Sequence, residues 1–576
     1  MKQTFKKRGQ KIAKKWERFS EQAREDSREH IKENLISRLP NARRVRLLML
    51  EWGLLIIVIL SLALTQSFWY TQSYSVQAYV DGGTYIEATT GNVNSLNPLF
   101  ATTNSERVLS KLMFSTLTTI DYSGHVGLGL AKSVTPDSDG KVWTVTLKDD
   151  LKWSDGEPIT LDDVMYTIEV ARDATINTNY ASNFSGVKVE RQDDALVFTL
   201  PSSYADFAST LIVPILPSHI LRDVPASKLL EHAFSTNPVT SGAFTFNATQ
   251  NLTSSGEKIV YLTANSNYYK GKPMLNSFAV HTYNDTGEIV TALSNGEVTA
   301  SAELSAVDAD LLSSASVYEK QTTIANGVFA FLNTTGDLLS EVSVRQAVRQ
   351  GIDLRQVRSV LDNEQSLNYP ILQSEIELDN YPEIPAYDLE AAKAAIAAAG
   401  VAGQTLQLAT ISTGYFPEIA AEFEAQLEKL GFGVELSIYN PGQEFLINVV
   451  RPRNYDILLY EIELGPDPDL FVYYHSSQAS TSGLNLSNYH SALVDDSILA
   501  ARSTMNESLR KAKYETFLRH WVNDVPAIGI YQASLTYYFN KNVRAFSEDD
   551  RLVYATDRFV DVEYWAVNKA QKNRTP

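Results

Sequence analysis

The stretch Leu147-Lys-Asp-Asp-Leu-Lys-Trp-Ser-Asp-Gly-Glu-Pro-Ile-Thr-Leu-Asp-Asp-Val164 connects two segments that have different periodicities. Residues 142–147, which lead into it, read Val-Trp-Thr-Val-Thr-Leu and alternate as in a half-buried strand. Near its end, Thr160 can cap a helix, and Asp162 and Asp163 fall in the first turn of that helix, where negative charge is favourable. The stretch therefore predicts a strand, a turn and a helix in succession.

Strands and helices alternate along the rest of the chain as well. Residues 136–140, Pro-Asp-Ser-Asp-Gly, predict a hairpin turn. Helices are predicted at residues 342–351, 388–399 and 416–430, with Gly351, Gly400 and Gly431 as left-handed stops. Strands are predicted at residues 84–89, 405–410, 433–438 and 455–460. Because 576 residues exceed what one core accommodates, we expect two or more domains, built as α/β lobes.

The N-terminal region combines a basic tail with one long apolar segment. Residues 1–46 carry a formal charge of +9, and the rest of the chain carries −27. Residues 47–70 are apolar over a length that lets a helix cross a bilayer, with Trp69 as an interfacial anchor. The arginines within residues 43–46 precede this segment, so the positive-inside rule predicts a cytoplasmic N-terminus and an external body.

Two alternatives stay open in this region. The apolar segment could be a cleaved signal peptide, with residues 76–78 as the cleavage site, although its basic region would exceed 40 residues. In the tail, Ile12, Trp16 and Phe19 have helical spacing, which fits an amphipathic helix on the inner membrane face. A solvated basic tail fits the same residues.

The composition and the motifs exclude several chemistries. The chain has no cysteine, which rules out disulfides, thiolate catalysis, cysteine-bound zinc and a lipidated-cysteine anchor. It has none of the usual nucleophile, zinc-protease, phosphate-loop or dinucleotide motifs, and its eight histidines are scattered. We therefore expect no enzyme activity, no metal site and no cofactor, although a glycosidase-like carboxylate pair stays open. The charge of −27 argues against nucleic-acid binding by the outer body.

The stretch at residues 147–164 resembles the most specific signature of the family-5 extracellular solute-binding proteins, the dipeptide and oligopeptide receptors of ABC importers. Further motifs resemble that family in the same order along the chain. They lie at residues 94–98, 240–244, 264–273, 292–298, 331–334, 344–348, 351–353, 387–393, 428–431 and 524–528. The resemblance covers residues 84–565, which is essentially the whole outer body.

The resemblance implies a two-lobed, periplasmic-binding-protein-like α/β fold with an inserted domain in lobe 1, here preceded by one transmembrane helix. The division that we expect is a cytoplasmic tail (1–46), a transmembrane helix (47–70), a linker (71–83), lobe 1 (84–325, with the inserted domain at about 106–215), lobe 2 (326–520), a C-terminal return to lobe 1 (521–565) and a tail (566–576). The lobes of such receptors enclose the ligand by closing about a hinge.

The function implied by the resemblance is that of an extracytoplasmic receptor. It would capture peptides and deliver them to ABC permease subunits, as a monomer held at the bilayer by its own helix. Two alternatives remain: a receptor for a non-peptide solute, and a membrane-anchored adhesion or sensing protein that reuses the fold.

In the peptide-binding relatives, the ligand lies extended between a segment after the first strand and a strand of the second lobe, held mainly through its backbone. By position, the first segment is residues 99–104, with Thr102 and Asn104 as candidate contacts. The facing strand is residues 455–463, with Tyr460 as a candidate contact.

Peptide receptors usually follow that strand with a Trp and then an Asp that pairs with the ligand's ammonium group. Neither residue is kept in register here. Glu461 and Glu463 are therefore candidates for the ammonium contact, and strand alternation predicts that they share a face. Because an unpaired buried charge is costly, an inward-facing Glu implies a cationic ligand group. The alternative is that both acids face solvent or pair with an arginine of the lobe.

Overall fold

The computed structural model describes residues 46–121, 123–176, 178, 180–252, 257–304, 308, 310–312, 317–361, 365–372, 376–545 and 551–573. The predictions for residues 1–45, a basic tail or an amphipathic helix, lie outside the described residues. The chain divides into two compact units, one formed by residues 1–78 with 569–576 and the other by residues 79–568.

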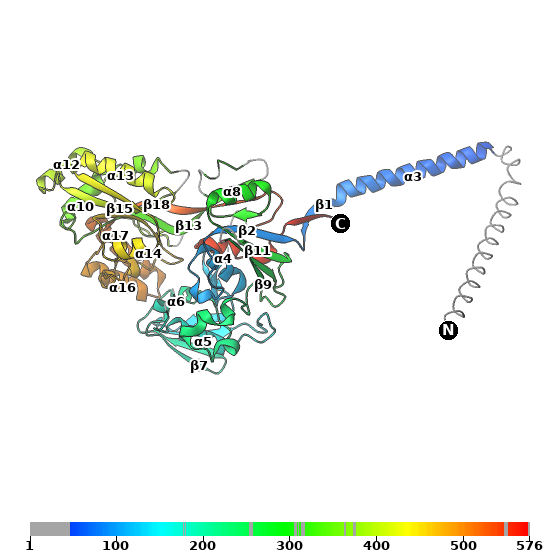
Figure 1. Cartoon of the computed structure of the whole chain (residues 1–576), viewed down its shortest axis with the longest axis horizontal. Helices are drawn as coiled ribbons and strands as arrows, with labels where there is room; N and C mark the ends of the chain where they lie inside the picture. The colour runs from blue at the N-terminus through cyan, green and yellow to red at the C-terminus, as the bar shows by residue number, and fades with distance from the viewer. Residues whose placement is uncertain are drawn as a thin grey trace. The chain divides into compact units, whose positions relative to one another are not determined.

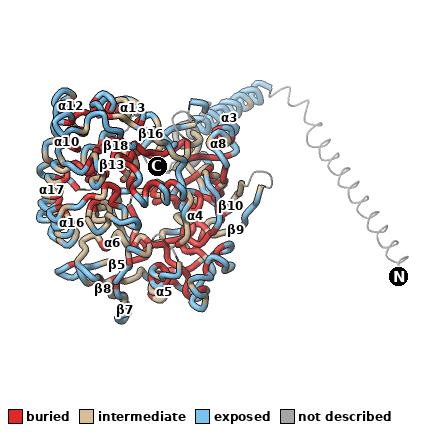
Figure 2. Tube along the Cα trace, turned by 60° about the vertical axis from the view of Figure 1, so that its left-hand side comes forward, coloured by how far each residue is buried: buried red, intermediate tan, exposed pale blue. Residues whose placement is uncertain are grey.

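The first unit contains helix α3 (Arg46–Tyr74), which has 29 residues. Its segment Arg46–Trp69 is the one helical segment in the described part of the chain that is long and apolar enough to cross a membrane. The side chains described along it are almost all exposed (Figure 2). Strand β1 (Ser75–Val80) follows directly and pairs with β19 (Asn568–Asn573), so the region predicted as a linker holds the end of α3 and a strand.

The second unit is built on an eleven-stranded sheet that both lobes share (Figure 1). Its strand order is β16-β15-β17-β13-β18-β12-β2-β11-β10-β9. The eleventh strand, β14, lies outside this order and pairs with β18. The lobe-1 strands are β2 (Thr84–Thr90), β9 (Phe244–Asn251), β10 (Lys258–Ala264), β11 (Ser277–Tyr283) and β12 (Ala300–Ser301). The lobe-2 strands are β14 (Gln365–Ser366), β15 (Thr405–Ile411), β16 (Gly433–Tyr439) and β17 (Ile457–Glu463).

Two long strands, β13 (Val317–Leu332) and β18 (Ala527–Asn540), run through both halves of the sheet. They pair antiparallel from Val317↔Asn540 to Phe331↔Ala527. The ladder is interrupted between Thr323 and Gly327, so residues 324–326 have no ladder partner on β18, although the Gln532 side chain donates to the Ile324 carbonyl at 2.9 Å. This pair of strands is the connection about which the lobes can turn.

Helices cover the lobe-2 half of the sheet (Figure 1). They are α10 (Val342–Gly351), α11 (Leu354–Arg358), α12 (Leu389–Ala398), α13 (Phe416–Leu430), α14 (Gln443–Phe445), α15 (Phe471–Tyr474), α16 (Ala492–Ser503) and α17 (Glu507–Asp524). Gly431 and Gly400 take the predicted left-handed conformation, with φ of 102° and 75°. The prediction for Gly351 was wrong, because this glycine is the last residue of α10 and does not have positive φ. Its lack of a side chain instead makes room for Leu430, which a Cβ would meet at 2.2 Å.

A smaller domain inserted in lobe 1 holds the four-stranded sheet β5-β6-β8-β7. Its strands are β5 (Ala131–Pro136), β6 (Val142–Leu147), β7 (Lys188–Gln192) and β8 (Ala195–Thr199). The predicted hairpin turn is confirmed, since Asp137 N–H donates to the Val142 carbonyl at 2.7 Å. Helix α5 (Leu161–Ala171) begins after Thr160, as the sequence predicts.

Asp163 explains why the signature stretch holds its shape. Its carboxylate is buried and accepts hydrogen bonds from the backbone N–H groups of Thr160 and Ser218, both at 2.7 Å. The indole of Trp153 also points to it, at 3.4 Å. One carboxylate therefore fixes the start of α5, the turn before it and a segment 55 residues away.

Lobe 1 proper adds α4 (Asn104–Met113) and α8 (Thr286–Asn295). One continuous core of buried side chains runs through lobe 1, the small domain and lobe 2. A second, smaller cluster lies under α8 and includes Ile289, Leu293 and Tyr538. The segment at residues 551–567 returns to lobe 1, where Trp565 packs 5.0 Å from Tyr85 between ring centroids.

Candidate functional site

Strand β17 has an open edge at its C-terminal end. It pairs with β13 from Ile457 to Glu463, but with β15 only at Ile457 and Leu458. Leu464 N–H donates to the Ala325 carbonyl at 2.7 Å, toward β13. Because main-chain groups alternate along a strand, those of Glu461 and Glu463 point to the opposite edge, where no described strand is paired. This edge can accept an extended chain.

Glu461 is a half-buried acid without a described cationic partner. Its carboxylate accepts a hydrogen bond from the Asn326 amide at 2.5 Å. Burial raises the pKa of Glu461; the Asn326 hydrogen bond opposes this shift, and the negative charge of Glu463 adds to it. Asn326 is the cross-strand partner of Glu463, so both acids lie on one face of β17, as alternation predicts.

Glu463 is exposed, and its charge acts on Tyr180 of the small domain. Burial raises the pKa of Tyr180, in the small domain, to about 12; the charge of Arg107 on α4 opposes this shift and that of Glu463 adds to it. Tyr473 donates its hydroxyl to the Glu463 carbonyl at 2.7 Å. Glu463 and Arg107 therefore act on the same tyrosine from opposite lobes. Tyr460 instead packs on Phe445, with 5.9 Å between ring centroids.

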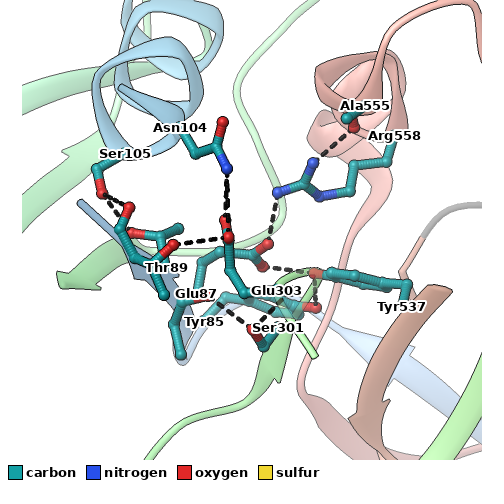
Figure 3. A network of polar contacts seen from close by, with 12 residues as sticks. Tyr85, Glu87, Thr89, Asn104, Ser105, Ser301, Glu303, Tyr537, Ala555 and Arg558 are labelled. Atoms are coloured by element: carbon teal, nitrogen blue, oxygen red, sulfur yellow. Dashed lines mark hydrogen bonds and ion pairs between the residues drawn. The ribbon is translucent and has the colours of Figure 1, made fainter. Parts of the chain in front are cut away.

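On the lobe-1 side, Thr102 and Asn104 are exposed and already bind carboxylates of lobe 1. Thr102 donates its N–H and hydroxyl to Glu106, at 2.8 and 3.1 Å. Asn104 directs its amide to Glu303, at 3.2 Å (Figure 3). No hydrogen bond in the described part of the chain joins either residue to Glu461 or Glu463. The structure thus places the two groups of candidates in different lobes, Thr102 and Asn104 in lobe 1 and the acids of β17 in lobe 2.

Glu106 is a residue that the sequence analysis missed. Its buried carboxylate accepts from the backbone N–H groups of Asn94, Ser95, Thr102 and Thr103. Burial alone would raise the pKa of Glu106, but these hydrogen bonds outweigh it and the pKa lies below its usual value. The Thr-x-x-Glu capping box at residues 103–106 was a local signal for it. Glu106 shapes the whole segment after the first strand.

Beneath Asn104 and Glu303, a buried network ties lobe 1 together (Figure 3). Arg558 and Glu87 form an ion pair at 2.7 Å, with side chains 3% and 0% exposed. Tyr537 of β18 donates its hydroxyl to Glu87 at 2.5 Å. Burial raises the pKa of Glu87, against the effect of Arg558. This network joins β2, β18 and the C-terminal return. It therefore holds the part of lobe 1 beneath Asn104 and Glu303 rigid.

The small domain and lobe 2 touch at a second place, which we call the boundary cluster: Tyr204 and Asp206 of the small domain with Asp467, Asp469, Arg502 and Arg510 of lobe 2. The Arg502 guanidinium lies over the Tyr204 ring at 4.3 Å and over Phe471 of its own lobe at 4.8 Å. Ala205 N–H donates to the Arg502 carbonyl at 2.8 Å. This contact holds the two parts together.

The acids of the boundary cluster are crowded. Arg510 pairs with Asp467, and Arg502 pairs with Asp469 at 3.2 Å. Burial and the neighbouring Asp467 charge raise the pKa of Asp206 well above its usual value, while a hydrogen bond from Ser209 opposes the shift. Two guanidinium groups thus face three carboxyl groups, and Asp206 is the one without an ion pair among the described residues.

No group of three or more His, Asp or Glu side chains in the described ranges is arranged to hold a metal ion. The candidate site consists of the open edge of β17, the acids Glu461 and Glu463 on one face of that strand, and the tyrosine-rich boundary between lobe 2 and the small domain. Two α/β lobes that share a pair of crossing strands, with such a site where they meet, define an extracytoplasmic solute-binding protein.

The chain belongs to family 5 of these proteins. The model of "Bacterial extracellular solute-binding proteins, family 5 Middle" matches residues 125–483. The oligopeptide-binding protein AppA of Bacillus subtilis is 26% identical over an alignment 482 residues long, which covers 78% of this chain and 86% of AppA. The predicted family and the receptor class are confirmed.

Solved structures share the fold. AppA from Bacillus subtilis in complex with a nonapeptide superposes with a TM-score of 0.70, at 23% identity, over 85% of this chain and 100% of AppA. NikZ from Campylobacter jejuni in complex with Ni(L-His) gives 0.71, at 22% identity, over 84% and 99%. The two-lobed α/β fold that the sequence predicts is confirmed.

Proposed function

We propose that this protein captures peptides at the open edge of β17 and delivers them to an ABC importer. The observation that carries the proposal is the edge of β17 at Glu461 and Glu463, which pairs with no described strand and has one side-chain donor, Tyr473, on the Glu463 carbonyl. Such an edge suits a ligand bound by strand addition. The relative named for oligopeptide binding and the family membership support it. A receptor of this kind has no need of catalysis, and we expect no turnover of bound peptide.

We further propose Glu461 as the partner of the ligand's ammonium group. Glu461 is half-buried, with one amide donor and no cation near it among the described residues, whereas Glu463 is exposed. A ligand ammonium group would neutralise the charge that burial makes costly at Glu461. Thr102, Asn104 and Tyr460 are proposed as contacts around this pair of acids.

The test is calorimetry of full-length protein in lipid nanodiscs with free and N-acetylated peptides of graded length. Losing the charge partner at a desolvated site costs about 2–5 kcal/mol, so Glu461→Gln should weaken binding of free peptides at least ~30-fold. Glu463→Gln, at an exposed position, is the matched control and should cost less than ~1 kcal/mol, below ~5-fold.

N-acetylation should weaken binding to the wild type about as much as Glu461→Gln does, and it should cost little further in that variant. Wild-type affinity in Glu461→Gln would rule out the ammonium contact but not peptide capture. If no peptide binds at all, peptide capture is wrong; native mass spectrometry of co-purified ligands then tests a non-peptide solute, such as the one in the NikZ structure.

We also propose that α3 is an uncleaved anchor with the N-terminus in the cytoplasm and that the outer body is monomeric. The support is the apolar segment Arg46–Trp69, preceded by arginines. Protease added to intact cells should remove the body and spare an N-terminal tag. A mature protein that lacks the tag would indicate a signal peptide, and a protected body would reverse the topology.

A further inference from the structure

Lobe 2 contains a recess that is separate from the site between the lobes. It has a volume of about 590 Å³ and lies between the end of α10, the start of α11, the segment at residues 381–387 and the first residues of β18. All its lining residues come from lobe 2, the end of α17 and the start of β18, and none is a candidate contact for the peptide. Movement of one lobe relative to the other should therefore leave the shape of the recess unchanged.

Arg349 lines this recess and is the reason to regard it as a site. Its side chain is buried, with the residue 7% exposed. Its Nη1 donates to the Val522 carbonyl, and its Nε has no hydrogen-bond partner. No carboxylate among the described residues lies within ion-pair distance of it. Burial lowers the pKa of Arg349 to about 10, so the group is still a cation at neutral pH.

Other arginines with an unpartnered Nε, such as Arg558, have a carboxylate partner, and Arg345, one turn earlier on α10, has several carbonyl acceptors. Arg345 donates to the carbonyls of Asp524, Leu339 and Ser340, at 2.8, 2.8 and 2.7 Å. A buried cation that is so weakly compensated destabilises the fold, unless an anion joins it. The guanidinium of Arg349 is thus placed to receive a negatively charged group from outside.

The rest of the recess is mostly apolar and aromatic. Tyr369 and Tyr381 lie with ring centroids 5.1 Å apart, and Tyr369 is held by a hydrogen bond to the Pro382 carbonyl at 2.7 Å. Leu354, Tyr387 and Trp521 also line the recess. Its volume falls in the range of about 300–1,000 Å³ that is typical of small-molecule sites.

Two acids also line the recess and limit the charge of the ligand. Asp353 is paired with Arg355 at 3.2 Å, and Glu383 is exposed. The four charged residues of the lining, Arg349, Arg355, Asp353 and Glu383, sum to zero formal charge. A monoanion is therefore tolerated better than a dianion such as phosphate. We propose that this recess binds small monocarboxylic acids that have an aromatic or bulky apolar body, with Arg349 holding the carboxylate.

The test uses full-length protein in nanodiscs and the probe 3-phenylpropionate, compared by calorimetry with its neutral isostere 3-phenylpropanamide. The carboxylate should bind at least ~10-fold more tightly than the amide, because a charge-assisted hydrogen bond to a guanidinium is lost in the amide. Arg349→Gln should weaken binding of the acid at least ~10-fold and leave the amide nearly unchanged. Arg451→Gln, which removes an exposed arginine of lobe 2 outside the recess, is the matched control and should leave the affinity for each probe within about twofold of the wild type.

Leu354→Trp fills the recess and leaves Arg349 in place; it should abolish binding of both probes, which separates loss of the site from misfolding of an arginine variant. Glu461→Gln should leave binding of the acid unchanged, which separates this recess from the peptide site. Equal affinity for acid and amide, wild-type affinity in Arg349→Gln, or no binding at millimolar acid would each overturn the proposal.

Discussion

Replacement of Tyr204 by Leu should shift the lobes toward the open state. Tyr204 is the small-domain residue that stacks on Arg502 of lobe 2, with 4.3 Å between the guanidinium carbon and the ring centroid. Arg502 keeps its second aromatic contact, with Phe471 at 4.8 Å, and its ion pair with Asp469. The substitution therefore removes one contact between the lobes and leaves lobe 2 as it is.

The size of the effect follows from the exposure of the pair. The Arg502 side chain is 30% exposed, between a fully exposed cation–π contact worth about 0.5–1 kcal/mol and a desolvated one worth ~2 kcal/mol. We take about 1–1.5 kcal/mol, which lowers the ratio of closed to open molecules by roughly 5- to 12-fold. The observed affinity for ligand should fall by up to the same factor if only the closed form binds.

Single-molecule energy transfer measures this ratio directly, and the chain suits it because it has no native cysteine. Gln192→Cys in the small domain and Ala394→Cys in lobe 2 put dyes at exposed positions in the two parts. Phe471→Leu, which removes the equivalent stack inside lobe 2, is the matched control and should leave the closed fraction nearly unchanged. If Tyr204→Leu leaves the closed fraction as in the wild type, or if both variants reduce it equally, the boundary cluster does not hold the lobes together.

Three further predictions concern carboxylates. Because the contact between the small domain and lobe 2 raises the pKa of Asp206 well above its usual value, that contact is most favourable below about pH 4 and weakens as pH rises through the raised pKa. Ligand affinity should therefore fall as pH rises above about 4, and Asp206→Asn should flatten this dependence in calorimetry. Asp163→Ala leaves the buried Ser218 N–H and the half-buried Thr160 N–H without an acceptor and should cost about 3–5 kcal/mol in urea unfolding, whereas Asp162→Ala should cost under ~1 kcal/mol. Glu106→Gln should speed amide hydrogen exchange at residues 94–103. Because the pKa of Glu106 is lowered, the wild type should itself lose its protection against exchange there below about pH 4.

The parts of the fold that the sequence predicted are those that local rules decide. Strand β6 and helices α10 and α13 begin and end where periodicity, caps and turns place them. Strand β17 begins at Ile457, two residues later than predicted, because the Tyr455 N–H turns back to the Arg453 carbonyl at 2.9 Å. The Tyr455 hydroxyl donates to the Leu486 carbonyl at 2.8 Å. That partner lies 31 residues away and leaves no local pattern.

The same distinction between local patterns and contacts of distant residues applies to the candidate site. Strand alternation predicted that Glu461 and Glu463 share a face, because alternation is a property of one strand. It gave no sign that Asn326 binds Glu461 or that Arg502 stacks on Tyr204, since these partners are 135 and 298 positions apart in the sequence. Contacts of this kind depend on the packing of the lobes, which a single sequence does not reveal.

The interruption of the β13–β18 ladder lies beside the proposed ligand site. Where residues 324–326 leave β18, the Ala325 N–H binds the Val553 carbonyl of the lobe-1 return at 2.9 Å, and Asn326 binds Glu461. The strand segment that must flex when the lobes turn is thus the one that holds the proposed ammonium partner. The proposed recognition of the ligand and the movement of the lobes thus involve the same three residues, 324–326. No separate chain of contacts is needed to couple them. We therefore expect a substitution at residues 324–326 to change both the ease of lobe movement and the affinity for ligand.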